Sequence, residues 1–345
     1  MKSTAAHVTP VPTKWVGPMK IIGEVVNEEV NVPLATFETP LWRSTSRGAR
    51  VSRHCDGISC TVVDERMCRS IVLRADDARS AKHAADAIVA RFDDLAVVVS
   101  STSRFAQLIG LNRQIVGNLL YLRLECSTGD ASGHNMVTKA ADAVLTWLLV
   151  EYPELSYSTI SGNYCTDKKN SAVNGILGRG KYVVAELKVP RDICARFLRT
   201  TPELIVQLNV EKNLLGGIIA GSLRSANAHF ANMLLGFYLA TGQDVANIIE
   251  GSQGFVHCEL RDENLYFSCT LPNLIVGTVG NGKHNQVIEE HLERLGCRKA
   301  SLPSDNARRL AVICAATVLC GELSLLAAQT NPGELIKAHV LLERR

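Results

Sequence analysis

The sequence Cys60-Thr-Val-Val-Asp-Glu-Arg-Met-Cys-Arg-Ser-Ile-Val-Leu73 opens the part of the chain that decides the fold. It is rich in β-branched and other apolar residues, which predicts a strand. Ala75-Asp76-Asp77 comes next, and alanines at helical spacing predict a helix from there to about residue 94. We expect the following elements to be strands at 95–99 and 115–126, a helix at 129–150 and a strand at 156–160.

The predicted order of strand, helix, strand, strand, helix and strand is the ferredoxin-like βαββαβ pattern. Single cores stop growing near about 250–300 residues, so a chain of 345 residues is expected to form two domains. We therefore predict an α+β fold. Residues 59–160 would form a small domain inserted into a large, helix-rich domain made of residues 1–58 and 161–345.

Three helices are expected in the larger part. Residues 225–241 have apolar residues on one helical face, and Gly242 ends the pattern. Asn331-Pro332 predicts the start of a short final helix that ends near His339. Residues 310–328 are long enough to cross a membrane, but Glu322 lies in their middle, so we predict a buried core helix.

Composition narrows the class of protein. The chain has 37 Lys and Arg against 34 Asp and Glu, a balance that lacks the concentrated positive charge of nucleic-acid-binding proteins. Eleven cysteines without Cys-x-x-Cys spacing indicate reduced thiols rather than disulfides or a zinc site. Residues 1–14 hold no apolar run of signal-peptide length. We therefore expect a cytoplasmic protein with no metal, nucleic-acid or membrane partner.

Two loops, at 175–181 and 277–283, match the G-x-x-x-x-G-K part of a phosphate-binding loop. Such a loop continues with Ser or Thr, whose hydroxyl binds Mg²⁺, whereas Tyr182 and His284 stand here. We expect these glycines instead to let the backbone approach a ligand or another strand closely. A phosphotransferase is therefore the less favoured alternative.

Two further segments suit phosphate binding. Residues 127–136 form a small-residue turn before a predicted helix, where free N–H groups and the helix dipole attract anions, although Asp130 is equally well explained as a helix cap. Ser103 and Arg104 stand at another predicted helix start, and the guanidinium could bind a second phosphate. Most exposed arginines at helix starts have no such role.

A longer set of motifs resembles the hydroxymethylglutaryl-CoA reductase family. Its centre is Ile160-Ser-Gly-Asn-Tyr-Cys-Thr-Asp-Lys-Lys169. Seven more segments follow the family's order: Ala35-Thr-Phe-Glu38, Ser101-Thr-Ser-Arg104, Gly129-Asp-Ala-Ser-Gly-His-Asn-Met136, Asn227-Ala-His229, Gly242-Gln-Asp244, Gly277-Thr-Val-Gly280 and Lys337-Ala-His339. The intact stretch from Tyr164 to Lys169 resembles the biosynthetic, NADPH-using class.

The resemblance implies a two-step reduction of the thioester hydroxymethylglutaryl-CoA to mevalonate, which uses two NADPH, releases CoA and feeds isoprenoid biosynthesis. It implies a large domain for the CoA substrate and a small one for the cofactor, joined by a loop at 161–175 that carries the catalytic lysine. Lys168 would stabilise the oxyanion and His339 would protonate the CoA thiolate. Glu38, coupled to Asp244 and Lys168, would protonate the final alkoxide.

Ligand contacts are carried over by matching position. The implied substrate contacts are Arg69, Ser161, Asn163, Asp167, Lys169, Lys212, His229 and Asn232. The implied cofactor contacts are Ser103, Arg104, Asp130, Ser132, Gly133, His134, Asn135, Gly277, Thr278, Val279 and Gly280. The sequence departs from residues common in the family at Ser132, His134, Asn281 and Lys283.

The resemblance also implies an obligate homo-oligomer, a dimer or a tetramer. In the family, the lysine loop meets the glutamate, aspartate and histidine of a neighbouring subunit. Two alternatives stay open: the same fold could oxidise mevalonate with NAD, or the ferredoxin-like part could be an RNA-binding platform. Aromatic residues make up only 5% of the chain, which leaves few rings for base stacking.

Overall fold

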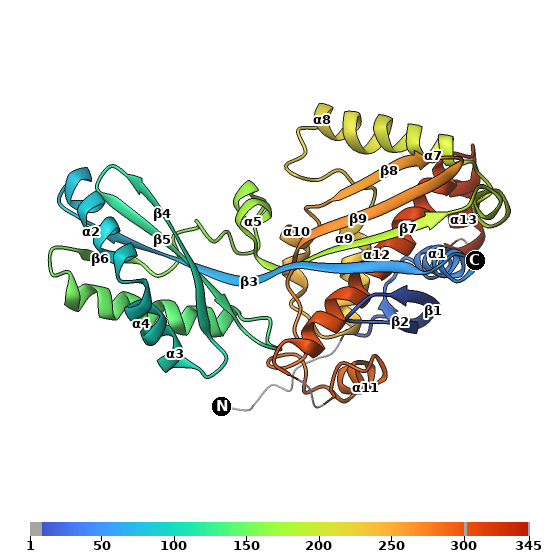
Figure 1. Cartoon of the computed structure of the whole chain (residues 1–345). Coiled ribbons are helices and arrows are strands. Elements are labelled where there is room, and N and C mark those ends of the chain that lie inside the picture. The colour runs from blue at the N-terminus through green and yellow to red at the C-terminus, as the bar shows by residue number, and fades with distance from the viewer. Residues whose placement is uncertain (1–8, 300–301, 344–345) are drawn as a thin grey trace.

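The computed structural model describes residues 9–299 and 302–343. Its organising element is β3 (Ile58–Arg74), which runs across the molecule from one group of strands to the other (Figure 1). Residues 59–66 of β3 pair with β7 (Gly180–Val189), whereas residues 67–74 pair with β5 (Leu119–Ser127), both antiparallel. One continuous strand therefore belongs to two sheets.

The larger sheet has the strand order β2-β1-β3-β7-β9-β8. Its further strands are β1 (Thr13–Ile22), β2 (Glu28–Ala35), β8 (Phe255–Arg261) and β9 (Asn264–Leu274). The main helices packed in this core are α1 (Pro40–His54), α9 (Phe230–Ala240) and α12 (Asp305–Gln329). The shorter helices of this part are α5 (Ala172–Leu177), α6 (Arg191–Ile193), η1 (Cys194–Leu198), α7 (Pro202–Leu208), η2 (Asn209–Gly216), α8 (Gly217–Ile219), η3 (Val245–Asn247), α10 (Ile248–Gly251), α11 (Gln286–Arg294) and α13 (Glu334–Glu343).

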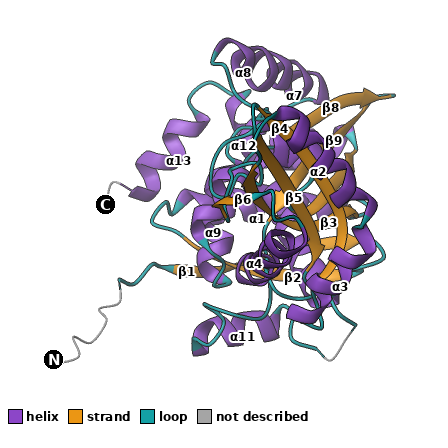
Figure 2. Ribbon diagram, turned by 90° about the vertical axis from the view of Figure 1, so that its left-hand side faces the viewer, coloured by secondary structure: helices purple, strands orange, loops and turns teal. Residues whose placement is uncertain are grey.

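Helix α12 lies in the centre of this core. It is the one described helix that is long and apolar enough to cross a membrane, and 94% of its most apolar window is buried inside the protein. The predicted buried core helix is therefore confirmed. Helix α13 follows it and lies at the edge of the molecule (Figure 2).

A second hydrophobic core forms around the other half of β3. There β5 pairs with β4 (Gln107–Val116), and β6 (Ser156–Thr159) pairs with β3. Helices α2 (Ala78–Ala90), α3 (Phe92–Thr102) and α4 (His134–Glu151) supply the rest of this core. By element type the order is strand, helical segment, two strands, helix and strand. The domain boundaries at 59 and 160 stay a prediction.

Two predicted strands in this part were wrong. Residues 95–99 form part of α3, where Leu95 and Val99 are buried and Val97 is 71% exposed. Burial four residues apart is a helical pattern, so packing against α4 overrides the strand propensity of the valines. The predicted strand at 115–126 is a hairpin that turns at Gly117, whose φ of 58° suits a tight turn.

Three predicted helix starts were also wrong. Helix α4 begins at His134, because Gly129 and Gly133 adopt positive φ angles of 57° and 97° that a helix does not allow. Helix α9 begins at Phe230 rather than 225. Helix α13 begins at Glu334 and continues to Glu343, so His339 is not at a helix end. The side chain of His339 lies outside the described residues.

The crossing of α1 and α12 yields the first prediction. A Cβ on Gly48 would lie 2.1 Å from the backbone oxygen of Cys320. Gly48→Ala should therefore push the helices apart and lower the free energy of unfolding by about 1–3 kcal/mol or more, measured by urea denaturation. Gly217→Ala is the control, because its Cβ would meet nothing closer than 3.5 Å. Equal stability of the two variants would contradict the observed helix crossing.

Candidate active site

The loop that carries Lys168 is held by a buried arginine. Arg179 is 1% exposed and donates hydrogen bonds to the backbone oxygen of Cys68 on β3, at 2.8 Å, and to the Asp167 carboxylate, at 2.6 Å. Asn174 donates to the backbone oxygen of Thr166 at 2.8 Å. The backbone N–H of Lys168 donates to Glu250 at 3.1 Å. The loop is therefore fixed on both sides of the lysine.

Three non-glycine residues of this loop have left-handed backbone conformations: Asn163 (φ 58°), Thr166 (φ 34°) and Lys168 (φ 54°). Such conformations cost about 1–3 kcal/mol each and persist only where the surroundings hold them. The hydrogen bonds around residues 166–168 supply that restraint. The loop thus presents the Lys168 side chain in a set direction.

Lys168 pairs with Asp244. Its Nζ lies 2.6 Å from Oδ2 of Asp244, and this hydrogen bond raises the pKa of the lysine. Burial alone would raise the pKa of Asp244, but the hydrogen bonds from Lys168 and from the Ala246 N–H outweigh burial and lower it. Both side chains are therefore charged at neutral pH. The pair forms within one chain, which corrects the expectation that the neighbouring subunit supplies Asp244.

The Lys168–Asp244 pair lines a cavity of about 450 Å³. The cavity gathers residues that sequence analysis assigned to three separate roles: Arg69, Ser132, Gly133, His134, Asn135, Asp167, Lys168, Asp244, Val279 and Gly280. A Cβ on Gly277 would lie 2.3 Å from the backbone nitrogen of Ser132. Thr278 also donates its N–H to the backbone oxygen of Asp130 at 2.8 Å. Close backbone approach, the role expected of the glycines, is confirmed here.

His134 faces Asp167 inside this cavity. Its Nε2 lies 3.7 Å from Oδ1 of Asp167, and its Nδ1 lies 3.5 Å from Oγ of Ser132. Burial, reinforced by the positive charge of Arg179, lowers the pKa of the imidazole to about 4. The ring is therefore neutral at pH 7.

Lys283 is a second lysine of this cavity. It is 5% exposed and donates to the backbone oxygen of Gly242, so it ties the glycine loop to the turn before Asp244. Burial lowers the pKa of Lys283 to about 8. A lysine engaged in this way does not act as the lysine of a phosphate-binding loop.

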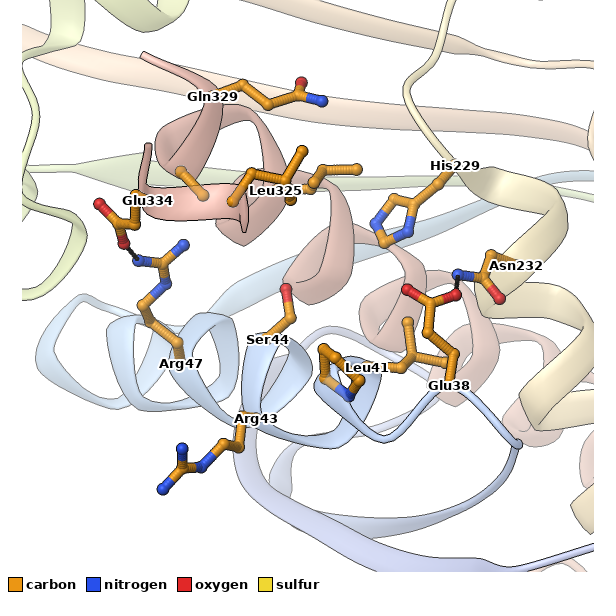
Figure 3. A pocket seen from close by; sticks show the side chains of 13 residues that line it. Glu38, Leu41, Arg43, Ser44, Arg47, His229, Asn232, Leu325, Gln329 and Glu334 are labelled. Carbon is orange, nitrogen blue, oxygen red and sulfur yellow. Dashed lines mark hydrogen bonds and ion pairs between the residues drawn. The ribbon is translucent and has the colours of Figure 1, made fainter. Parts of the chain in front are cut away.

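Glu38 lies in a different place. It lines a second cavity, of about 420 Å³, together with His229 and Asn232 (Figure 3). Asn232 donates to Oε2 of Glu38 at 2.6 Å. None of the described residues lines both this cavity and the one around Lys168.

Several other expected contacts lie outside these two cavities. Ser161 accepts a hydrogen bond at 3.4 Å from Arg69, which itself lines the Lys168 cavity, and Lys169 donates to the backbone oxygen of Asp167 at 3.1 Å. Lys212 is half-buried, and burial lowers its pKa. Ser103 and Arg104 follow the end of α3 instead of starting a helix, which corrects that expectation.

Asp130 is not the cap of α4. Its carboxylate accepts the N–H of Ala307, near the start of α12, at 2.9 Å. The reading of Asp130 as a local helix cap is therefore wrong, because its partner lies 177 positions away. Among the described residues there is no group of three or more His, Cys, Asp or Glu that could hold a metal ion.

Sequence analysis missed a cluster of cations. A cavity of about 670 Å³ is lined by six basic residues: Lys14, Arg43, Arg47, Arg50, Arg196 and Arg199. Three of these arginines lie on α1 at spacings of four and three, which places them on one helical face. That spacing is visible in the sequence and could have predicted the cluster of cations. The cluster suits a polyanionic ligand.

A charged lysine–carboxylate pair in a cavity walled by glycine-rich backbone defines the site of an enzyme. The family model for hydroxymethylglutaryl-coenzyme A reductase matches residues 6–344, and the chain belongs to that family.

Relatives from three organisms agree with this assignment. The chain is 44% identical to the 3-hydroxy-3-methylglutaryl-coenzyme A reductase of Pyrococcus horikoshii, covering 98% of this chain and 82% of the relative. It is 43% identical to the reductase of Aeropyrum pernix, covering 97% and 79%. Reductase 1 of Arabidopsis thaliana is 40% identical, covering 97% of this chain and 57% of the plant protein.

The fold is also found among solved structures. The class II 3-hydroxy-3-methylglutaryl-CoA reductase of Streptococcus pneumoniae, bound to NADPH in open conformations, superposes with a TM-score of 0.76. The two sequences are 20% identical, over 96% of this chain and 88% of the other.

The neutral state of His134 gives the second prediction. Folding lowers the pKa of His134 from 6.5 to about 4. Between these two pH values the unfolded chain therefore binds a proton that the native protein does not. The contribution of the neutral His134 side chain to the free energy of unfolding is thus complete above pH 6.5 and is lost as the pH falls toward 4. His134→Met should therefore show a weaker fall in free energy of unfolding between pH 7 and pH 5 than wild type, by urea denaturation. Identical pH profiles would contradict the buried, neutral imidazole.

Proposed function

We propose that this chain reduces hydroxymethylglutaryl-CoA to mevalonate in two steps with two molecules of NADPH. The observation that carries the proposal is the Lys168–Asp244 pair at 2.6 Å, in one cavity with the glycine-rich segments at 131–136 and 279–281. Family membership gives the reaction, and this geometry supplies a cation beside a ligand-sized cavity.

The residues around the cavity fit a dinucleotide. Gly280 has a φ of 96° and nothing within 4 Å of an added Cβ, so its backbone is open to a ligand. The backbone of residues 132–135 leads into the first turn of α4, an 18-residue helix whose N-terminus attracts phosphate. These segments would hold the NADPH, which supplies hydride when bound. Ser103 and Arg104 would bind its 2′-phosphate.

Lys168 performs the first role in the mechanism. A hydride that reaches the thioester carbonyl creates an oxyanion, and the Lys168 ammonium stabilises that charge. Asp244 keeps the lysine protonated through its short hydrogen bond. When the hemithioacetal collapses, His339 would protonate the leaving CoA thiolate. Glu38 would donate the proton that the second alkoxide needs.

The substrate has two anionic ends. Its carboxylate would be bound by the cations, amides and hydroxyl proposed from sequence: Arg69, Ser161, Asn163, Lys169, Lys212, His229 and Asn232. Asp167, the remaining proposed contact, is an anion and would instead accept a hydrogen bond from the substrate hydroxyl. The six-cation cluster around Arg47 would take the phosphates of CoA, since guanidinium groups bind phosphate oxygens in pairs. This cluster shares Arg43, Arg47 and Glu334 with the wall of the Glu38 cavity, so the two sites are continuous.

The third prediction tests the lysine. Lys168→Ala should lower kcat by about 10²–10³-fold, because removing one oxyanion donor has that effect. The assay follows NADPH consumption after addition of hydroxymethylglutaryl-CoA, with two NADPH consumed for each CoA released. Lys82→Ala, at an exposed lysine paired with Asp86, is the matched control. A Lys168→Ala enzyme at the wild-type rate would refute the proposal.

We also propose that two copies of the chain complete each site, with Glu38 and His339 from one subunit and Lys168 and Asp244 from the other. Glu38 and Lys168 line separate cavities, yet the mechanism needs both at one substrate. Phe37, beside Glu38, is 68% exposed, and η2–α8 exposes an apolar stripe made of Val210, Leu214, Leu215, Ile218 and Ile219. Helix α8 lies at the periphery of the molecule (Figures 1 and 2). A second copy would bury this surface.

The fourth prediction is complementation. Glu38→Gln and Lys168→Ala should each be nearly inactive, but refolding them together should restore about a quarter of wild-type activity, because half of the dimers are mixed and each has one intact site. Purified single variants, refolded alone, are the control. Absence of any recovered activity would mean that each chain builds its own site.

The free thiols support a reducing compartment such as the cytoplasm. All eleven cysteines lie in the described part of the chain without a disulfide, and ten of them are buried.

A further inference from the structure

Glu322 is an acidic residue in the middle of α12, the long apolar helix buried in the larger core. It is 0% exposed on α12. A buried carboxylate is costly unless hydrogen bonds satisfy it. Its two oxygens accept the backbone N–H groups of Ala228, at 2.8 Å, and His229, at 2.6 Å. The carboxylate is therefore bound to a single turn of backbone rather than to a partner cation.

That turn is the entry to α9, which begins at Phe230. His229 precedes the helix, and its Nε2 lies 3.9 Å from Oε1 of Glu322. Asn232, in the first turn of α9, donates to Glu38 at 2.6 Å. Figure 3 shows the side chains of Glu38, His229 and Asn232 turned toward one another. Fixing the turn thus fixes the direction of all three groups.

The negative charge of Glu322 also affects the pKa of Lys212. Burial lowers the pKa of this lysine, and the negative charge of Glu322 opposes that effect. A neutral side chain at position 322 would remove this opposition and make protonated Lys212 less favourable. This electrostatic effect on Lys212 accompanies the hydrogen bonds by which Glu322 holds the turn at His229.

We propose that Glu322 is a positioning residue of the reductase site: it anchors the turn at 228–229 and thereby aims His229, Asn232 and Glu38 into the cavity that contains Glu38. This inference rests on the proposed function. Glu322 touches no reacting atom and acts through these residues. Its position explains why an otherwise apolar core helix carries an acid at its centre.

The test is a double-mutant cycle. Glu322→Gln keeps the size of the side chain, but turns an amide N–H toward one of the two backbone donors. Its kcat/KM for hydroxymethylglutaryl-CoA should fall about ten- to a hundredfold, as expected for loss of a hydrogen bond to a charged group. The KM for NADPH should not change, because the cofactor segments line the other cavity. In a His229→Ala background the same substitution should have a much smaller effect.

Thr317→Val is the matched control. Thr317 is buried on the same helix, and its partners among the described residues are the backbone oxygen of Ile313 on that helix and the sulfur of Met19. Its variant should therefore lose stability without changing either KM. Glu322→Asp keeps the charge on a shorter side chain and should restore part of the kcat/KM. If Glu322→Gln does not fold, Glu322→Asp takes its place in the double-mutant cycle.

Two results would overturn the inference: wild-type constants for both Glu322 variants, or full additivity with His229→Ala. The wild-type enzyme is assayed in parallel. Its failure to oxidise NADPH with hydroxymethylglutaryl-CoA would overturn the proposed function itself, and the inference with it.

Discussion

The buried guanidinium of Arg179 is the interaction on which the site depends. It joins β3, through the backbone oxygen of Cys68, to Asp167 next to Lys168, and its Nε lies 3.5 Å from Glu250. Arg179 is 1% exposed, and leaving a buried charge without its partner costs up to about 3–5 kcal/mol. This restraint is strong enough to hold Thr166 and Lys168 in left-handed conformations. Since β3 belongs to both sheets, the lysine loop is attached at the junction between the two cores.

The two cores make the cavity possible. Residues 131–136 come from the part packed around α4, whereas residues 277–283 and Asp244 come from the part packed around α12. Gly277 allows the two backbones to touch, as the parallel bridge between Ala131 and Val279 shows. A side chain at position 277 would separate them. The glycine-rich segments and the charged pair thus share a cavity only because the halves of β3 hold their cores next to each other.

The charges around the cavity are arranged in a consistent way. Asp244 keeps Lys168 protonated, burial keeps His134 neutral, and Arg179 neutralises Asp167. The cavity that contains Glu38 is arranged in a similar way with different groups, since the Glu322 carboxylate accepts the backbone N–H of His229 in the turn that carries it. In both places a fully buried charged residue outside the cavity sets the direction of a side chain inside it. Preorganised groups of this kind are what stabilises developing charge in a transition state.

Local patterns in the sequence were sufficient for the long elements β3 and α12, because periodicity and burial agree there. The motif around Lys168 and the glycine segments also named residues that meet in one cavity. Local patterns failed at α3, where packing overrides the strand propensity of the valines, and at the start of α4, where the positive φ angles of Gly129 and Gly133 decide. Only the tertiary structure decided that Lys168 meets Asp244 of its own chain, that Asp130 bonds Ala307 and that Glu322 holds His229. These pairs are separated by 76 to 177 positions and form because distant segments pack together, which no local pattern encodes.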